Sequence, residues 1–157
     1  MTERELFDRE VQRIATFCKN PPPRGEDMVG YLSAHLCILL YGYFENSVER
    51  IVYSDCPNMP DKKVKSHGNF KPKELKKYVA RRSPQCRREL STIFINDVDM
   101  GEMLTSLVDS RNRIAHRDRI AHNGNGYLSV SQLENYAEKI YALEDLITDI
   151  VKKHPLH

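Results

Sequence analysis

Two closely spaced arginine–histidine pairs are the residues of this chain best suited to chemistry on a phosphodiester. Arg111 and His116 are five residues apart, and Asn112 directly follows the arginine. Arg117 and His122 repeat the spacing immediately downstream. Histidine can act as base or acid near neutral pH, and arginine is a permanent, fork-shaped phosphate ligand. Each pair therefore predicts proton transfer beside a bound phosphate.

RNA cleavage by the neighbouring 2′-hydroxyl needs what such a pair supplies. A base removes the hydroxyl proton, an acid protonates the leaving 5′-oxygen, and a cation stabilises the crowded phosphate, without a metal. Five residues turn through roughly 140° on a straight helix, so we expect the helix to end or kink between Arg111 and His116. One copy offers one histidine, and two copies across a twofold axis offer two. Arginine and histidine near a helix C-terminus also interact favourably with the helix dipole. The spacing alone is therefore compatible with a purely structural role as well.

The periodicity of apolar residues predicts helices and no convincing strand pair. Residues 85–96 suit a short helix, although residues 92–95 also suit a strand, and either Asp97 or Asp99 can cap the helix that leads into the Arg111 motif. Ser131 is the expected cap of the last helix. The predicted fold class is all-α, a compact bundle of four to five helices within one domain over residues 1–157. The expected helices cover residues 2–18, 26–53, 72–82 and 85–96, a stretch that begins at Asp97 or Asp99 and leads into the Arg111 motif, and residues 131–153.

Composition indicates a soluble globular protein, because 40% of the 157 residues are hydrophobic and 29% are charged. The N-terminus lacks the apolar stretch of a secretory signal, and no apolar run approaches the roughly 20 residues of a membrane helix. We therefore expect a cytoplasmic protein without a membrane span.

The cysteines give no sign of a metal site. Cys18, Cys37, Cys56 and Cys86 are far apart, with no Cys-x-x-Cys pair and no histidine at finger-like spacing. The sequence predicts four small thiols in a reducing compartment, with no metal and no cofactor.

Positive charge is concentrated in residues 61–90, which hold eleven Lys or Arg and three Asp or Glu. This segment carries +8, while the rest of the chain carries −6. Such a segment can contact the phosphates of RNA, or it can be a solvated lysine-rich surface. The candidate RNA-binding residues are Lys62, Lys63, Lys65, Lys71, Lys73, Lys76, Lys77, Arg81 and Arg82.

The Arg111–His116 segment resembles the Arg-x4-6-His motif of the HEPN superfamily, where Asn, Asp or His commonly follows the arginine. The run from Leu39 to Glu45, Leu-Leu-Tyr-Gly-Tyr-Phe-Glu, resembles the glycine-and-glutamate signature of the RiboL-PSP-type branch. With the helix order, the resemblance covers nearly the whole chain. It implies a HEPN bundle that dimerises with the motif at the interface and acts as a metal-independent endoribonuclease leaving a 2′,3′-cyclic phosphate. Such proteins often serve as toxins or antiviral defence effectors, with an antitoxin or defence-system partner.

Carried onto this sequence, the resemblance gives each residue of the motif a role. Arg111 binds the scissile phosphate, Asn112 orients it or the histidine, and His116 is the acid or base. Glu45 either supports the residues that contact the RNA, or lies on the solvent-exposed edge of its helix. Arg113 adds a phosphate contact or points to solvent.

Arg117 and His122 are the alternative pair, and we prefer the first copy because it continues directly from a core-facing helix. One departure concerns regulation: the tyrosine that stands two residues after the histidine in the branch controlled by adenylylation is replaced here by Asp118. The alternative functions are a non-catalytic HEPN module that binds RNA, a nucleotide or a protein partner, and a purely structural subunit.

Overall fold

The computed structural model describes residues 1–55, 69–115 and 128–155, and all regular structure in these ranges is helical. This confirms the predicted all-α class. The described ranges contain six α-helices, more than the four to five expected for the bundle, and each corresponds to one of the helical stretches predicted from the sequence. The helices are α1 (Glu3–Lys19), α2 (Val29–Val52), α3 (Pro72–Val79), α4 (Pro84–Asn96), α5 (Val98–Ala115) and α6 (Val130–Lys153), with a 3-10 turn η1 (Glu26–Met28) before α2.

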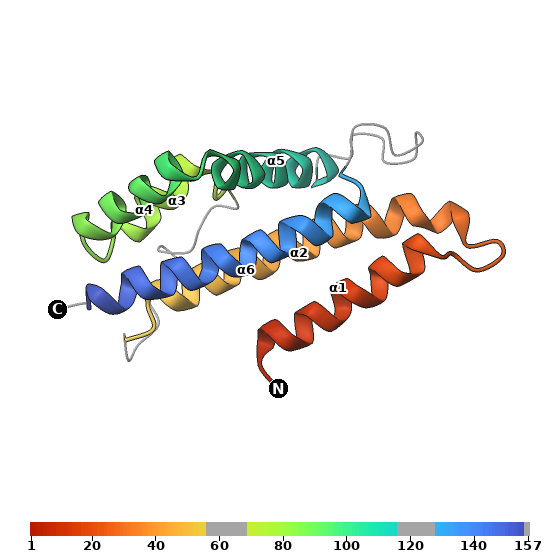
Figure 1. The fold of residues 1–157 in the computed structure, drawn as a ribbon, viewed down its shortest axis with the longest axis horizontal. Coiled ribbons are helices and arrows are strands. Elements are labelled where there is room, and N and C mark those ends of the chain that lie inside the picture. The colour runs from red at the N-terminus through yellow and green to blue at the C-terminus, as the bar shows by residue number, and fades with distance from the viewer. Residues whose placement is uncertain (56–68, 116–127, 156–157) are drawn as a thin grey trace.

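The long helices α2 and α6 lie side by side at the centre of the bundle (Figure 1). Both run in the same direction, while α1 and α5 run the opposite way on either side of them (Figure 1). The short helices α3 and α4 pack against each other and against α5, at the end of the bundle where α6 finishes. This arrangement places the C-terminal part of α5 beside the middle of α2.

Side-chain caps fix where several helices begin. Thr2 accepts from the backbone N–H of Glu5 in a capping box. Ser83 caps α4 and is followed by Pro84 at the first helical position. Asp97 accepts from the N–H of Met100 at the start of α5. Of the two candidate caps, Asp97 and not Asp99 therefore caps this helix.

The expected cap of the last helix is wrong by two residues. Ser129, and not Ser131, accepts from the N–H of Gln132, and the Gln132 side chain accepts from the N–H of Ser129 in return. The third helix also differs, because it ends at Val79 and not at Arg82.

The core forms between the inward faces of α2, α5 and α6. Its largest fully buried side chains include Leu40 and Phe44 from α2, Leu104 from α5, and Ile140 from α6. Met28, Tyr31 and His35 lie outside the buried face of α2 and are exposed. Within the described ranges, no helix combines the length and the apolar character needed to cross a bilayer.

Candidate functional site

The guanidinium of Arg111 lies over an aromatic ring of a neighbouring helix. Its central carbon is 4.9 Å from the centroid of the Tyr41 ring on α2, which is a cation–π contact. Arg111 Nη1 also donates to Asn112 Oδ1 at 2.8 Å. Arg111 and Asn112 are both half-buried near the C-terminal end of α5. The two sequence-predicted residues therefore meet, and Asn112 accepts directly from the arginine.

Tyr41 is held at its hydroxyl as well as by its ring. The side chain is buried, its hydroxyl donates to Glu45 Oε2 at 2.8 Å, and the backbone N–H of Phe70 donates to it at 3.0 Å. Burial, and then the nearby Glu45 carboxylate, raise the pKa of Tyr41 well above its ordinary value. Tyr41 is thus a neutral, fixed platform beneath a permanent cation.

Glu45 reaches the arginine through Tyr41. The two residues are four apart on α2 and so share a face of the helix. Glu45 is half-buried and accepts a hydrogen bond from the Tyr41 hydroxyl. The supporting role that the resemblance implies for Glu45 stays a prediction. Tyr41 itself was not selected as a site residue, although the four-residue spacing to Glu45 was a signal for it.

Cys37 lies on α2 near the same arginines. Burial raises the pKa of its thiol to about 12, against the opposing effect of the positive charges of Arg111 and Arg113. The thiol is therefore protonated at neutral pH and is not a nucleophile there. Cys18 and Cys86 also carry free thiols, while Cys56 lies outside the described residues.

Arg113 projects from another side of α5 than Arg111. Two residues on a helix are separated by about 200°. Arg113 is exposed and lines a groove of about 600 Å³ together with Asp109, which forms an ion pair with Lys71 at 2.7 Å. The last turns of α5 thus carry two arginines that face different surroundings.

The chain is helical from Arg111 through Ala115, and His116 lies outside the described residues. A break between Arg111 and His116 can therefore fall only after Ala115, and the break itself stays a prediction. Arg117 and His122 of the second copy also lie outside the described residues, as do Lys62, Lys63 and Lys65.

The described part of the basic segment presents cations on one side of α3. Lys73, Lys77 and Arg81 are exposed, while Lys71 and Lys76 are half-buried. Arg81 lies over the Tyr78 ring, 4.5 Å from its centroid. The neighbouring α4 adds two exposed arginines, Arg87 and Arg88, that were not among the predicted RNA-binding residues. The dense basic run made both detectable from the sequence.

Arg82 has a different role from the one predicted for it. Its side chain is only 1% exposed and donates to both carboxylate oxygens of Asp55, at 2.7 and 2.8 Å. It also donates to the backbone oxygens of Val52 at 2.6 Å and His154 at 3.0 Å. Arg82 therefore caps backbone oxygens at the C-terminal ends of α2 and α6. Its guanidinium is unavailable to RNA in this structure.

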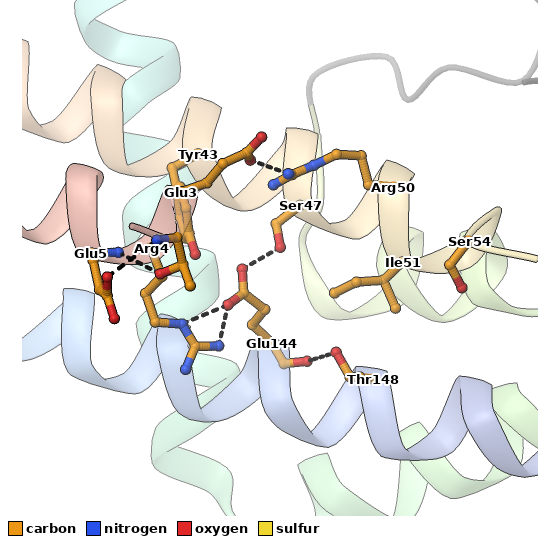
Figure 2. A pocket seen from close by; sticks show the side chains of 11 residues that line it. Glu3, Arg4, Glu5, Tyr43, Ser47, Arg50, Ile51, Ser54, Glu144 and Thr148 are labelled. Atoms are coloured by element: carbon orange, nitrogen blue, oxygen red, sulfur yellow. Dashed lines mark hydrogen bonds and ion pairs between the residues drawn. The ribbon is translucent and has the colours of Figure 1, made fainter.

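A second polar cluster lies between α1, α2 and α6, and sequence reasoning missed it. Figure 2 shows Arg4 and Ser47 both pointing at Glu144, which is 7% exposed. Arg4 Nε donates to Glu144 Oε1 at 2.8 Å, and Ser47 donates to the other carboxylate oxygen. A groove of about 690 Å³ opens beside them. A glutamate within the apolar stripe Ile140, Leu143, Ile147 was the available signal.

The Arg4–Glu144–Ser47 cluster is a clasp that holds the first helix in place. Arg4 also pairs with Asp145 at 2.6 Å, so two acidic residues of α6 bind one residue of α1. Burial raises the pKa of Tyr43, beside this clasp, to about 12. Because its buried carboxylate is satisfied by partners from two other helices, the cluster serves the fold.

No group of His, Cys, Asp and Glu side chains within the described ranges is arranged to hold a metal ion. No family model, curated protein or solved structure matches this chain. A function can therefore be proposed only from the Arg111–His116 motif, from the resemblance of this motif to that of the HEPN superfamily, and from the geometry around Arg111.

Proposed function

We propose that this chain is a metal-independent endoribonuclease of the HEPN type that acts as a homodimer. The observation that carries the proposal is the placement of Arg111. Its guanidinium lies on the buried ring of Tyr41, near the C-terminal end of α5 and five residues before His116 in the sequence. A phosphate-binding cation is thus pre-positioned in the same short segment as a residue that can transfer protons.

In the proposed mechanism, Arg111 binds the scissile phosphate and stabilises the charge that develops on it. Asn112 fixes one edge of the guanidinium by accepting from Nη1. His116 acts as acid or base when the RNA 2′-hydroxyl attacks the adjacent phosphorus and the 5′-oxygen leaves. The products are a 2′,3′-cyclic phosphate and a free 5′-hydroxyl.

Two protomers are required because the reaction needs both an acid and a base. Each protomer supplies one Arg111–His116 pair, and a twofold axis brings the second His116 to the same phosphodiester. The exposed cations of α3 and α4 extend the positive surface over which an RNA strand can lie. We assign the biological role of a cytoplasmic toxin or antiviral defence effector, restrained by an antitoxin or defence-system partner.

Incubation of the purified protein with total RNA and tRNA, with and without EDTA, tests the proposal. Cleavage that persists in EDTA and yields 2′,3′-cyclic phosphate ends is the expected result. RNA that is bound but left intact indicates the non-catalytic RNA-binding module. Absence of both cleavage and binding indicates a structural subunit, and either of these outcomes overturns the proposed activity.

A further inference from the structure

The outer side of α2 carries an exposed surface without the charges that are usual on such a helix. Residues 28–44 contain no Asp, Glu, Lys or Arg, in a chain of which 29% is charged. Many of these residues belong to the core, but Met28, Tyr31 and Ile38 are 48%, 54% and 41% exposed. The solvent side of a surface helix normally holds charged and polar residues. Over roughly four turns, α2 instead presents apolar side chains to water.

The exposed residues of α2 form one continuous row. Four residues at spacings of four, three and four fall on the same side of the helix, and we call them the outer row: Tyr31, His35, Ile38 and Gly42. The first three are exposed and Gly42 is half-buried. The row faces away from α6, because Ser47, which hydrogen-bonds to α6, lies roughly 140° around the helix from Gly42.

Gly42 is the least expected residue of the outer row. It lies in the interior of α2, where glycine destabilises a helix relative to alanine. A Cβ at Gly42 would meet no neighbouring atom within 4 Å in the described part of the chain. Packing among the described residues therefore does not require glycine at this position. On an exposed apolar row, a missing side chain leaves room for a second helix to approach closely.

The outer row borders the residues that support Arg111. Ile38 is three residues before Tyr41, and Gly42 is three residues before Glu45. Residues at this spacing are neighbours on a helix surface. The Arg111 guanidinium lies over the Tyr41 ring, 4.9 Å from its centroid. A molecule bound on the outer row therefore lies beside the pair of residues that holds Arg111.

A second copy of the chain fits the outer row better than it fits the basic helices. In a twofold contact the same surface comes from both protomers, so residues near the axis meet their own copies. The exposed cations of α3 and α4, among them Lys73 and Arg87, would then face like charges, which is strongly unfavourable. The outer row contains no Asp, Glu, Lys or Arg and can face itself without this repulsion.

We infer that the outer row is the core of the homodimer interface, with the two α2 helices crossing close to Gly42. The inference rests on the proposed function, in which two protomers act on one phosphodiester, and it names the surface that brings them together. Burial of Tyr31 and Ile38 drives the association. The crossing places the Tyr41–Arg111 pairs of both protomers near the twofold axis.

Analytical ultracentrifugation without RNA, over a series of protein concentrations, tests this interface. Wild type should sediment as a dimer. Gly42→Leu fills the crossing point, and Ile38→Asp brings two like charges close to the axis. Each change should raise the dimer dissociation constant about 10-fold or more. Both positions lie on the surface of the protomer, so circular dichroism should show that both variants are folded.

Two control variants match these substitutions. Gly30→Leu makes the same change on the same helix, where a Cβ also meets no described atom within 4 Å. Gly30 points roughly 120° away from Gly42. Leu146→Asp introduces the same charge as Ile38→Asp at a similar exposure, 37%, but on α6. Both controls should dimerise like wild type.

The outcomes separate this interface from the proposed activity. A monomeric wild type overturns the inference, since a row covered by a different protein predicts that result. A dimer that neither Gly42→Leu nor Ile38→Asp weakens also overturns it, and leaves the ribonuclease proposal standing. A dimer that these two changes weaken and the controls do not supports the interface. If that wild-type dimer leaves RNA intact, only the proposed activity fails.

Discussion

The Arg111 guanidinium lies 4.9 Å from the centroid of the Tyr41 ring, and this contact joins the C-terminal part of α5 to the middle of α2. Tyr41 is fixed in turn by Glu45 and by the backbone of Phe70. An arginine in a terminal helix turn thereby acquires a rigid support from the core. A cation held in this way loses little conformational entropy when it binds a phosphate.

This relationship predicts different effects for two changes at Tyr41. Tyr41→Phe keeps the ring but leaves the Phe70 N–H without its acceptor, which should lower the free energy of unfolding by about 1 to 3 kcal/mol. Tyr41→Leu also removes the cation–π contact, so RNA cleavage should fall a further 2- to 30-fold or so. Urea denaturation and cleavage rates measure the two effects. Equal cleavage by both variants would show that the ring does not position Arg111.

Arg82 should be far more important for stability than its exposed neighbours. Arg82→Ala leaves Asp55 and the carbonyl oxygens at the ends of α2 and α6 without their donor, so the free energy of unfolding should drop by about 3 to 5 kcal/mol. Arg87→Ala, at an exposed position on α4, should change it by less than about 0.5 kcal/mol. Chemical denaturation compares them, and similar losses for both would contradict the burial of Arg82.

The clasp between α1 and α6 predicts a non-additive response. Arg4→Ala deprives the buried Glu144 carboxylate of a charged donor and should cost about 1.5 to 3 kcal/mol of unfolding free energy. Adding Glu144→Leu removes the unpaired charge, so the double variant should be less destabilised than the sum of the single changes. Arg13→Ala, exposed on the same helix, is the control. Simple additivity would argue against the clasp.

The exposed cations of α3 should set the salt dependence of RNA binding. Removing two phosphate contacts with Lys73→Ala and Lys77→Ala should reduce the slope of log affinity against log salt by about 1.4 for single-stranded RNA. Arg9→Ala with Arg13→Ala removes two exposed cations from α1, on the far side of α2 and α6 from α5 (Figure 1). Fluorescence anisotropy across a series of salt concentrations should show an unchanged slope for this control pair. Equal slope changes for both pairs would remove α3 from the RNA path.

Much of the helical architecture follows from local signals. Thr2 with Glu5, Ser83 with Pro84, and Asp97 are local capping signals that lie at the starts of α1, α4 and α5. The start of α6 could not be decided in this way. Ser129 is followed three residues later by Gln132 and Ser131 by Glu134, so both present a capping-box pattern. Only the packing of the helix selects between them.

Tertiary position decided the features that periodicity and charge could not predict. The run from Leu36 to Leu40 is apolar on all sides, so its pattern does not fix which face of α2 is buried. Arg81 and Arg82 are adjacent and identical in charge, yet one is exposed and the other is buried. Arg82 is buried because the ends of α2 and α6, distant in sequence, converge on it.

Cleavage of RNA by wild type, His116→Ala and His122→Ala, each in the presence of EDTA, tests the proposed activity most directly. The wild type should remain active, His116→Ala should lose about 10²- to 10⁴-fold in rate, and His122→Ala should stay close to wild type. Loss of wild-type cleavage in EDTA, or a His116→Ala variant as active as the wild type, would contradict a mechanism based on Arg111 and His116.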